Sequence, residues 1–381
     1  MLSLNISGSK RLRLTSFKRL NNLTYLNLSR NNLVELPVNI FNPLNKLEEL
    51  ILNNNCLMSL NEISKLYNLK KLDISNNQLT ILPNNIFINL NHITNLDISS
   101  NLLRTLPSNI FDNLNHMISL NISSNLLETL PNNIFDNLNS LTNLNISINL
   151  LEELPNNIFY KLNNLISLNI SANLLETLQS NIFENLTHLI NLNINYNYIK
   201  LFPNTKFNQL ITLELCCNKL QVFPLIICKT LKNLNLSFNQ IKIVPNLNKF
   251  SELIKLDLSK NKLEEIDYNA FCNLTKLYNL NMSFNSLKNL HSHTFKNLYN
   301  LEYLNLKYNN IQQFNPFIFI PLTSIVQLNI TNTYSEFTSL FTFCKQLVNL
   351  NNYPNLLFNK LDKEEASIII QMVCAKYINI L

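Results

Sequence analysis

One pattern recurs along most of the chain and constrains its fold more than any other feature. The segment LTYLNLSRNNL, which begins at Leu23, has the form L-x-x-L-x-L-x-x-N-x-L. We number positions within each repeat from its leading residue. The fourth position is leucine fourteen times, at intervals of 21 to 24 residues, at Leu26, Leu50, Leu72, Leu96, Leu120, Leu144, Leu168, Leu192, Leu213, Leu234, Leu256, Leu280, Leu304 and Leu328. A repeat of this length predicts a solenoid in which each unit stacks on its neighbours.

The repeat resembles that of the leucine-rich-repeat superfamily, from Met1 to about Ser335. Its second half reads L-P-x-N-I-F-x-N-L, and most repeats have 24 residues. These features are similar to the "typical" class, which is best known from Toll-like receptor ectodomains and small leucine-rich proteoglycans. Those families carry cysteine-rich caps at both ends. The chain has no such caps, and this departure argues against an extracellular receptor role.

The resemblance implies an α/β repeat solenoid, a curved horseshoe with a parallel concave sheet and short helical or extended convex segments. Its L-x-L residues would form short strands, with leucines pointing into the core. The Asn at the ninth position would turn the chain inward and satisfy buried backbone groups with its side-chain amide. This structural ladder comprises Asn31, Asn55, Asn77, Asn101, Asn125, Asn149, Asn173, Asn197, Asn218, Asn239, Asn261, Asn285 and Asn309.

Phenylalanine recurs in the second half of the repeats, at Phe41, Phe87, Phe111, Phe135, Phe159, Phe183, Phe271, Phe295 and Phe319. We interpret these rings as a spine that packs inside the convex layer, and not as a ligand site. The repeats between Leu192 and Leu256 have only 21 or 22 residues. We expect them to lack about one turn of convex structure.

Two parts are predicted: a solenoid of about 14–15 repeats over residues 1–335, with degenerate first and last repeats, and a C-terminal segment over residues 336–381. From Asp362 this segment reads as a helix, because Asp362 and Glu365 are spaced as in a capping box. Apolar residues follow on more than one face of that helix. The helix is either a cap on the last repeat or a docking element for a partner.

The concave face is where leucine-rich repeats usually bind, and its exposed positions are predicted to be the second, third, fifth, seventh and eighth. Over the fourteen strands these positions carry seven basic and seven acidic residues, so the face is neutral. Serine and asparagine dominate it, and the repeats from Leu96 to Leu168 are nearly identical. This uniformity gives little sign of adaptation to a ligand.

Aromatic residues gather instead on the strands towards the C-terminal end. Because aromatic side chains are frequent at interface hot spots, we predict that they bind a partner. The candidates are Tyr196, Phe238, Tyr278, Phe284, Tyr303 and Tyr308. Alternatively, the rings at the eighth position merely pack over the edge of the neighbouring strand.

Composition narrows the function further. A net charge of +6 on 381 residues is a mild excess, well below that of a typical nucleic-acid-binding protein. The chain has one glycine, which excludes phosphate-binding loops that need two or more. The seven cysteines are scattered and odd in number, as in a reducing compartment. No signal peptide, catalytic motif or third metal ligand beside His291 and His293 is evident.

The sequence therefore predicts a non-enzymatic scaffold or adaptor in the cytoplasm that binds a protein partner on its concave face. We expect it to be a monomer, with no cofactor, metal, nucleic acid or membrane span. The alternative is an extracellular or surface recognition protein, because receptor ectodomains share the 24-residue repeat. Glycosylation sequons such as Asn121-Ile-Ser123 would matter only in that second case.

Overall fold

A computed structural model describes residues 2–9, 17–60, 63–311, 316–319 and 321–330. The chain divides into two compact units, Met1–Tyr198 and Ile199–Leu381. The predicted helix that begins at Asp362 lies outside the described residues, as does the whole segment 336–381. The division of the chain at residue 335 therefore stays a prediction.

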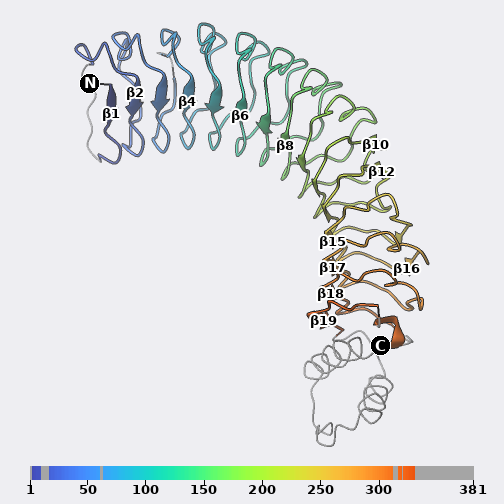
Figure 1. Cartoon of the computed structure of the whole chain (residues 1–381). Coiled ribbons are helices and arrows are strands. Elements are labelled where there is room, and N and C mark those ends of the chain that lie inside the picture. The colour runs from blue at the N-terminus through green and yellow to red at the C-terminus, as the bar shows by residue number, and fades with distance from the viewer. Residues whose placement is uncertain (1, 10–16, 61–62, 312–315, 320, 331–381) are drawn as a thin grey trace, which may run out of the picture. The chain divides into compact units, whose positions relative to one another are not determined.

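The first unit is built on nine parallel strands that lie side by side in chain order (Figure 1). Each strand has only three residues, with the fourth-position residue of its repeat at the centre. The strands are β1 (Ser3–Asn5), β2 (Tyr25–Asn27), β3 (Glu49–Ile51), β4 (Lys71–Asp73), β5 (Asn95–Asp97), β6 (Ser119–Asn121), β7 (Asn143–Asn145), β8 (Ser167–Asn169) and β9 (Asn191–Asn193).

The second unit repeats this arrangement with six parallel strands in chain order. They are β11 (Thr212–Glu214), β13 (Asn233–Asn235), β15 (Lys255–Asp257), β17 (Asn279–Asn281), β18 (Tyr303–Asn305) and β19 (Gln327–Asn329). In both units leucine lies opposite leucine in the register, as with Leu120 and Leu144 or Leu256 and Leu280. The predicted fold class, a parallel-sheet repeat solenoid, is confirmed.

Burial explains why the strands can be so short. From β2 onward the central leucine of every strand is buried, and its two neighbours are half-buried or exposed. One leucine could not hold a strand alone, but the leucines of successive repeats pack into a continuous core. The apolar residue at the sixth position, such as Leu28 or Ile146, is fully buried behind it.

The return segments, which lead from one strand to the next, consist of turns and contain no α-helix in the described part of the chain. One 3₁₀ helix is present, η1 (Pro316–Phe319). The predicted phenylalanines are buried in these segments, and Phe87, Phe111 and Phe135 stack with centroids 6.4–6.5 Å apart. Phe17 occupies the equivalent position in the first repeat and stacks on Phe41 at 6.4 Å.

The shorter repeats of the second unit differ in their return segments. There the turns are partly replaced by two-residue strands, which pair in parallel as β10 with β12 and β14 with β16. Their bounds are β10 (Thr205–Lys206), β12 (Ile226–Ile227), β14 (Ile243–Val244) and β16 (Glu265–Ile266). An extended segment rises further per residue than a turn, so in the repeats of 21 or 22 residues that hold β10, β12 and β14 it closes the repeat with fewer residues. Their partner strand β16 lies in a repeat of 24 residues.

The asparagine at the ninth position joins each repeat to the one before it. The side chain of Asn149 donates from Nδ2 to the carbonyl oxygens of Ile146 in its own repeat, at 3.1 Å, and Ile122 in the preceding repeat, at 3.2 Å. Its Oδ1 accepts the N–H of Leu127 at 3.2 Å. Equivalent bonds recur along both units, and every one of these asparagines except the half-buried Asn285 is buried. The amide thus satisfies backbone groups that would otherwise be buried without partners.

We expect the substitution Asn125→Ala to destabilise the protein by about 1–3 kcal/mol, because it leaves the Leu103 N–H buried without a partner and removes one of the two amide donors to the Ile98 C=O. The free energy of unfolding from urea denaturation measures this effect. The exposed Asn132 in the same repeat provides the control, and Asn132→Ala should change stability by less than about 0.5 kcal/mol. Equal effects of the two variants would contradict the ladder's role.

Candidate aromatic binding surface

The backbone at the eighth position is left-handed in every repeat where this position is described. From Arg30 to Tyr308 its φ lies between 51° and 58°. A non-glycine side chain pays roughly 1 kcal/mol or more for this conformation, and bulky residues are rare in it. In the first unit the position mostly holds small or polar residues, such as Asn54, Asn76 and Ser100. Aromatic residues at this position in the second unit therefore require a favourable interaction whose free energy offsets the cost of the left-handed backbone.

Three of the predicted rings form a column with a lysine at this position in the second unit. The Nζ of Lys260 lies 4.2 Å from the ring centroid of Phe238 and 5.2 Å from that of Phe284. The rings of Phe284 and Tyr308 are 4.4 Å apart at their centroids. All three rings remain 40–47% exposed, so packing on neighbours covers only part of each. We call Phe238, Lys260, Phe284 and Tyr308 the ring column.

A second pair of predicted rings, Tyr278 and Tyr303, lies at the start of β17 and β18. Their centroids are 5.2 Å apart, and both side chains are half-buried. Hydrogen bonding to Tyr303 raises the pKa of Tyr278 to about 12, with burial as the next cause. The phenol of Tyr278 therefore stays a neutral hydrogen-bonding group at neutral pH.

The remaining predicted residue, Tyr196, belongs to the first unit. It has the same left-handed backbone, with φ 56°, and is 61% exposed.

The sequence analysis did not predict that lysines lie over the aromatic rings. It counted Lys260 and Lys307 only as charges, whereas Lys307 Nζ lies 4.9 Å from the centroid of Tyr308. The signal available was the succession of Phe238, Lys260, Phe284 and Tyr308 at the eighth position of neighbouring repeats.

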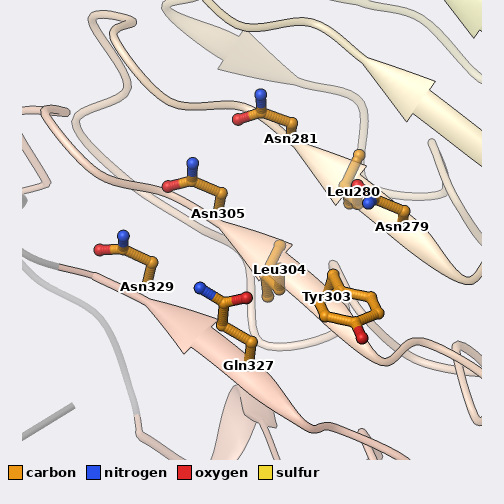
Figure 2. A pocket seen from close by; sticks show the side chains of 8 residues that line it. All are labelled: Asn279, Leu280, Asn281, Tyr303, Leu304, Asn305, Gln327 and Asn329. Carbon is orange, nitrogen blue, oxygen red and sulfur yellow. The ribbon is translucent and has the colours of Figure 1, made fainter.

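Between the strands of the second unit lies a shallow depression of about 180 Å³. Figure 2 shows Asn281, Asn305 and Asn329 in one row beside it, with Tyr303 and Gln327 nearer the start of the strands. Its floor is Leu280 and Leu304. The surface offers amide donors and acceptors but no charge, so it suits hydrogen bonding to a polypeptide better than binding of an ion.

The prediction that the seventh position is exposed is wrong for most repeats. Ser29, Ser75, Ser123, Ser237 and their equivalents are buried. In most repeats both the N–H and the hydroxyl of this serine donate to the fifth-position side chain, as Ser123 does to Asn121 Oδ1 at 3.2 and 2.7 Å. The serine closes the turn and is not available to a ligand.

Acidic residues at the fifth position accept from the asparagine of the next repeat in three places. Asn121 Nδ2 donates to Asp97 Oδ2 at 3.0 Å, and Asn235 and Asn281 donate in the same way to Glu214 and Asp257. Asp73 is different, because its partner in the next strand is Asp97, another carboxylate. The two acids lie beside a depression of about 260 Å³.

Burial raises the pKa of Asp73 above its ordinary value of 3.8, and the charge of Asp97 adds to the rise, while hydrogen bonds from Ser75 oppose it. A carboxyl whose pKa is raised by folding stabilises the fold only when protonated. This contribution is complete below the unfolded pKa and is lost as the pH rises through the folded pKa. At neutral pH, therefore, the ionised Asp73 destabilises the first unit.

Comparison with known proteins gives the family. The model described as "BspA type Leucine rich repeat region (6 copies)" matches residues 10–129 and 80–214. Two further leucine-rich-repeat models match residues 252–274 and 275–334. The chain belongs to the leucine-rich-repeat family. A comparison with curated protein sequences finds no match.

Solved structures give the same picture of the fold. A leucine-rich-repeat protein of Leptospira interrogans is 27% identical, with a TM-score of 0.77 over 92% of this chain and 94% of that chain. An internalin of Listeria monocytogenes is 23% identical, with a TM-score of 0.61 over 80% of this chain and 85% of that one. A chain of the Drosophila Toll–Spatzle complex is 22% identical, with a TM-score of 0.59 over 77% of this chain and 45% of that one.

Leucine-rich-repeat folds of this kind are generally interaction modules and not enzymes, and the Toll–Spatzle structure is one complex formed by such a protein. A search of the described residues for membrane-spanning helices finds none of sufficient length and hydropathy. The family thus favours protein–protein interaction in general and leaves the partner open.

We expect Asp73→Asn to stabilise the protein by up to about 0.5 kcal/mol at pH 7, a small gain because partial exposure screens the two charges. The amide keeps an oxygen for Ser75. Below about pH 3, where Asp73 is protonated, the gain should vanish. Urea denaturation of wild type and variant at both pH values measures it, with the exposed Asp112→Asn as control. A gain that persists unchanged in acid would rule out this explanation.

Proposed function

We propose that the chain is a non-enzymatic scaffold or adaptor that binds a protein partner through the second unit, with the ring column and the pair Tyr278 and Tyr303 as its main contacts. The observation that carries this proposal is the ring column itself. Three large rings occupy strained backbone positions and remain partly exposed. Burial of such rings against a partner would offset the backbone cost, because aromatic side chains supply much of the free energy at interfaces.

The neutral face beside the column supports a polypeptide ligand. Asn279 and Gln327 carry amides on this face, and such groups both donate and accept, as the backbone of a bound peptide requires (Figure 2). The side-chain oxygens of Asn281 and Asn305 already accept bonds from their own turns. The first unit offers a partner fewer large side chains at the eighth position. Its eighth position carries Ser100, Ser124 and Ala172 in repeats that nearly copy one another.

A combined variant, Phe238→Asn, Phe284→Asn and Tyr308→Asn, tests the site. Asparagine already holds the same φ at Asn54 and Asn76, so the substitutions fit the backbone. We expect the melting temperature to stay within a few degrees of wild type. Binding of the partner that co-purifies with the wild-type protein from its native cells should weaken at least about a hundredfold, since a hot-spot ring contributes about 2 kcal/mol or more.

The matched control replaces three tyrosines that are equally exposed on return segments, Tyr67, Tyr160 and Tyr299, with asparagine. This variant should bind the partner as wild type does. The proposal is wrong if the ring-column variant still binds with unchanged affinity, or if the control loses binding equally.

We further propose that the protein acts in the cytoplasm. The thiol of Cys228 supports this location, because it is buried in the second unit and donates to the carbonyl oxygen of Leu210 at 3.3 Å. Five cysteines of the described residues form no disulfide: Cys56, Cys216, Cys217, Cys228 and Cys272. A free buried thiol acts as a small core residue and suits a reducing compartment.

Thiol counting after isolation from native cells under non-reducing, alkylating conditions separates the two locations. Unfolded protein from the cytoplasm should show all seven cysteines as thiols. Three disulfides and one thiol would instead support the extracellular alternative. Glycans on sequons such as Asn121-Ile-Ser123 would also contradict a cytoplasmic location.

A further inference from the structure

The chain segment that follows each strand of the second unit carries an unusual excess of positive charge. It covers positions seven to twelve of the repeat and includes the ring column. After these strands the described residues contain six lysines and one acid, Glu264, a net of five positive charges. The lysines are Lys219, Lys242, Lys260, Lys262, Lys288 and Lys307. We call this surface the lysine edge.

The first unit shows that the fold does not require this charge. In its described residues the same positions hold two basic residues, Arg30 and Arg104, and three acids, Glu128, Glu152 and Glu176, a net of one negative charge. Arg104 Nη1 also pairs with Glu128 Oε1 at 3.0 Å. Equivalent backbone positions are therefore neutralised in one unit and basic in the other. Because the repeats share one backbone fold, the difference in charge between the two units comes from their sequences and not from a requirement of the fold.

The lysine edge is one continuous strip. Backbone hydrogen bonds tie each repeat's tenth residue to the eleventh residue of the repeat before it. Gln240 N–H donates to Leu220 C=O at 2.8 Å, and Ser286 N–H to Leu263 C=O at 2.9 Å. Lys262 N–H makes the equivalent bond to Ile241 C=O at 3.0 Å, and its Nζ donates to Gln240 Oε1 at 3.3 Å.

Five lysines of the edge form no ion pair with a carboxylate of the described residues. Across the residues that the structure describes, no carboxylate lies within salt-bridge distance of Lys242, Lys260, Lys262, Lys288 or Lys307. Lys260 and Lys307 instead lie over aromatic rings. A strip of like charges is unfavourable in the free protein, and an anionic ligand would relieve it.

The ring geometry distinguishes between two anionic ligands. Bases of single-stranded nucleic acid bind by stacking on exposed ring faces. Here the ammonium of Lys260 lies over Phe238 and Phe284, and Tyr308 packs against Phe284, so those faces are in use. Ring edges carry partial positive charge and favour anions. Carboxylates can contact ring edges and ammonium groups together without displacing Lys260.

We infer that the lysine edge binds an acidic polypeptide segment, rich in aspartate and glutamate, that lies along the strand ends from Lys219 to Lys307. This inference rests on the proposed protein-binding function and names the chemistry of the partner. The strip crosses five strands, at β11, β13, β15, β17 and β18. With four intervals of roughly 4.8 Å between these strands and about 3.3 Å per residue of extended chain, a segment of about six residues is enough to span it.

The test measures binding of the full-length protein to a fluorescein-labelled glutamate-rich peptide of about ten residues at low ionic strength. The variant Lys242→Gln, Lys260→Gln and Lys288→Gln should bind the peptide at least about tenfold more weakly, because three exposed ion pairs are lost. Wild-type affinity should also fall as salt rises. A control variant with the same charge change, Lys206→Gln, Lys249→Gln and Lys296→Gln, should bind as wild type does, since those lysines are exposed outside the edge.

Three results would overturn the inference: no binding of the peptide by wild type, an equal loss in both variants, or tighter binding of an oligothymidylate of similar length. The last result would indicate a nucleic acid ligand. Failure of this inference is distinguishable from failure of the proposed function. If the native partner still depends on the ring column while the peptide does not bind, the protein-binding function stands and only the acidic partner is wrong.

Discussion

Thirteen repeats of this protein close on an asparagine amide, which is buried in all of them but the one at Asn285. The side chain of Asn149 holds two carbonyl oxygens and one N–H, and it joins two successive repeats. Without it, the N–H of Leu127 would be buried unpaired and two carbonyl oxygens would each lose one of their amide donors, at a cost of about 1–3 kcal/mol per repeat. The same turn requires the left-handed backbone at the eighth position, directly before the asparagine. The ladder therefore determines where the eighth side chain projects.

That constraint links stability to the candidate site. Because the eighth side chain projects from the same place in every repeat, residues at this position on neighbouring repeats meet one another. In the first unit the position is mostly filled by small side chains such as Ser124 and Ala172. In the second unit it holds Phe238, Lys260, Phe284 and Tyr308, which contact in sequence along the strand ends. The same left-handed position thus carries mostly small or polar side chains in the first unit and aromatic and basic side chains in the second.

The sequence predicted the sheet, its register and the Phe stack because each depends on a residue that recurs at a fixed interval. Leu120 opposite Leu144 follows directly from a 24-residue step. Features that depend on side-chain orientation were harder to predict. Ser123 was expected on the surface, but its hydroxyl turns to Asn121 Oδ1 and becomes buried. The short strands β10 and β12 were missed because they replace a turn without a repeating signal of their own.

The candidate site was predictable in part. The rings were identified from their residue types, but the insertion of Lys260 between Phe238 and Phe284 depends on rotamers and distances that spacing does not supply. The adjacency of Asp73 and Asp97 follows from the register, but the burial that raises the pKa of Asp73 does not.

Hydrogen–deuterium exchange of the free and partner-bound protein tests the central claim most directly, namely that the partner binds the second unit at the strand ends. The account predicts slower exchange on binding in peptides that cover 236–243, 258–265, 282–289 and 304–311. It predicts no change in the nearly identical repeats over 95–175. Protection confined to those repeats, with the second unit unchanged, would contradict it.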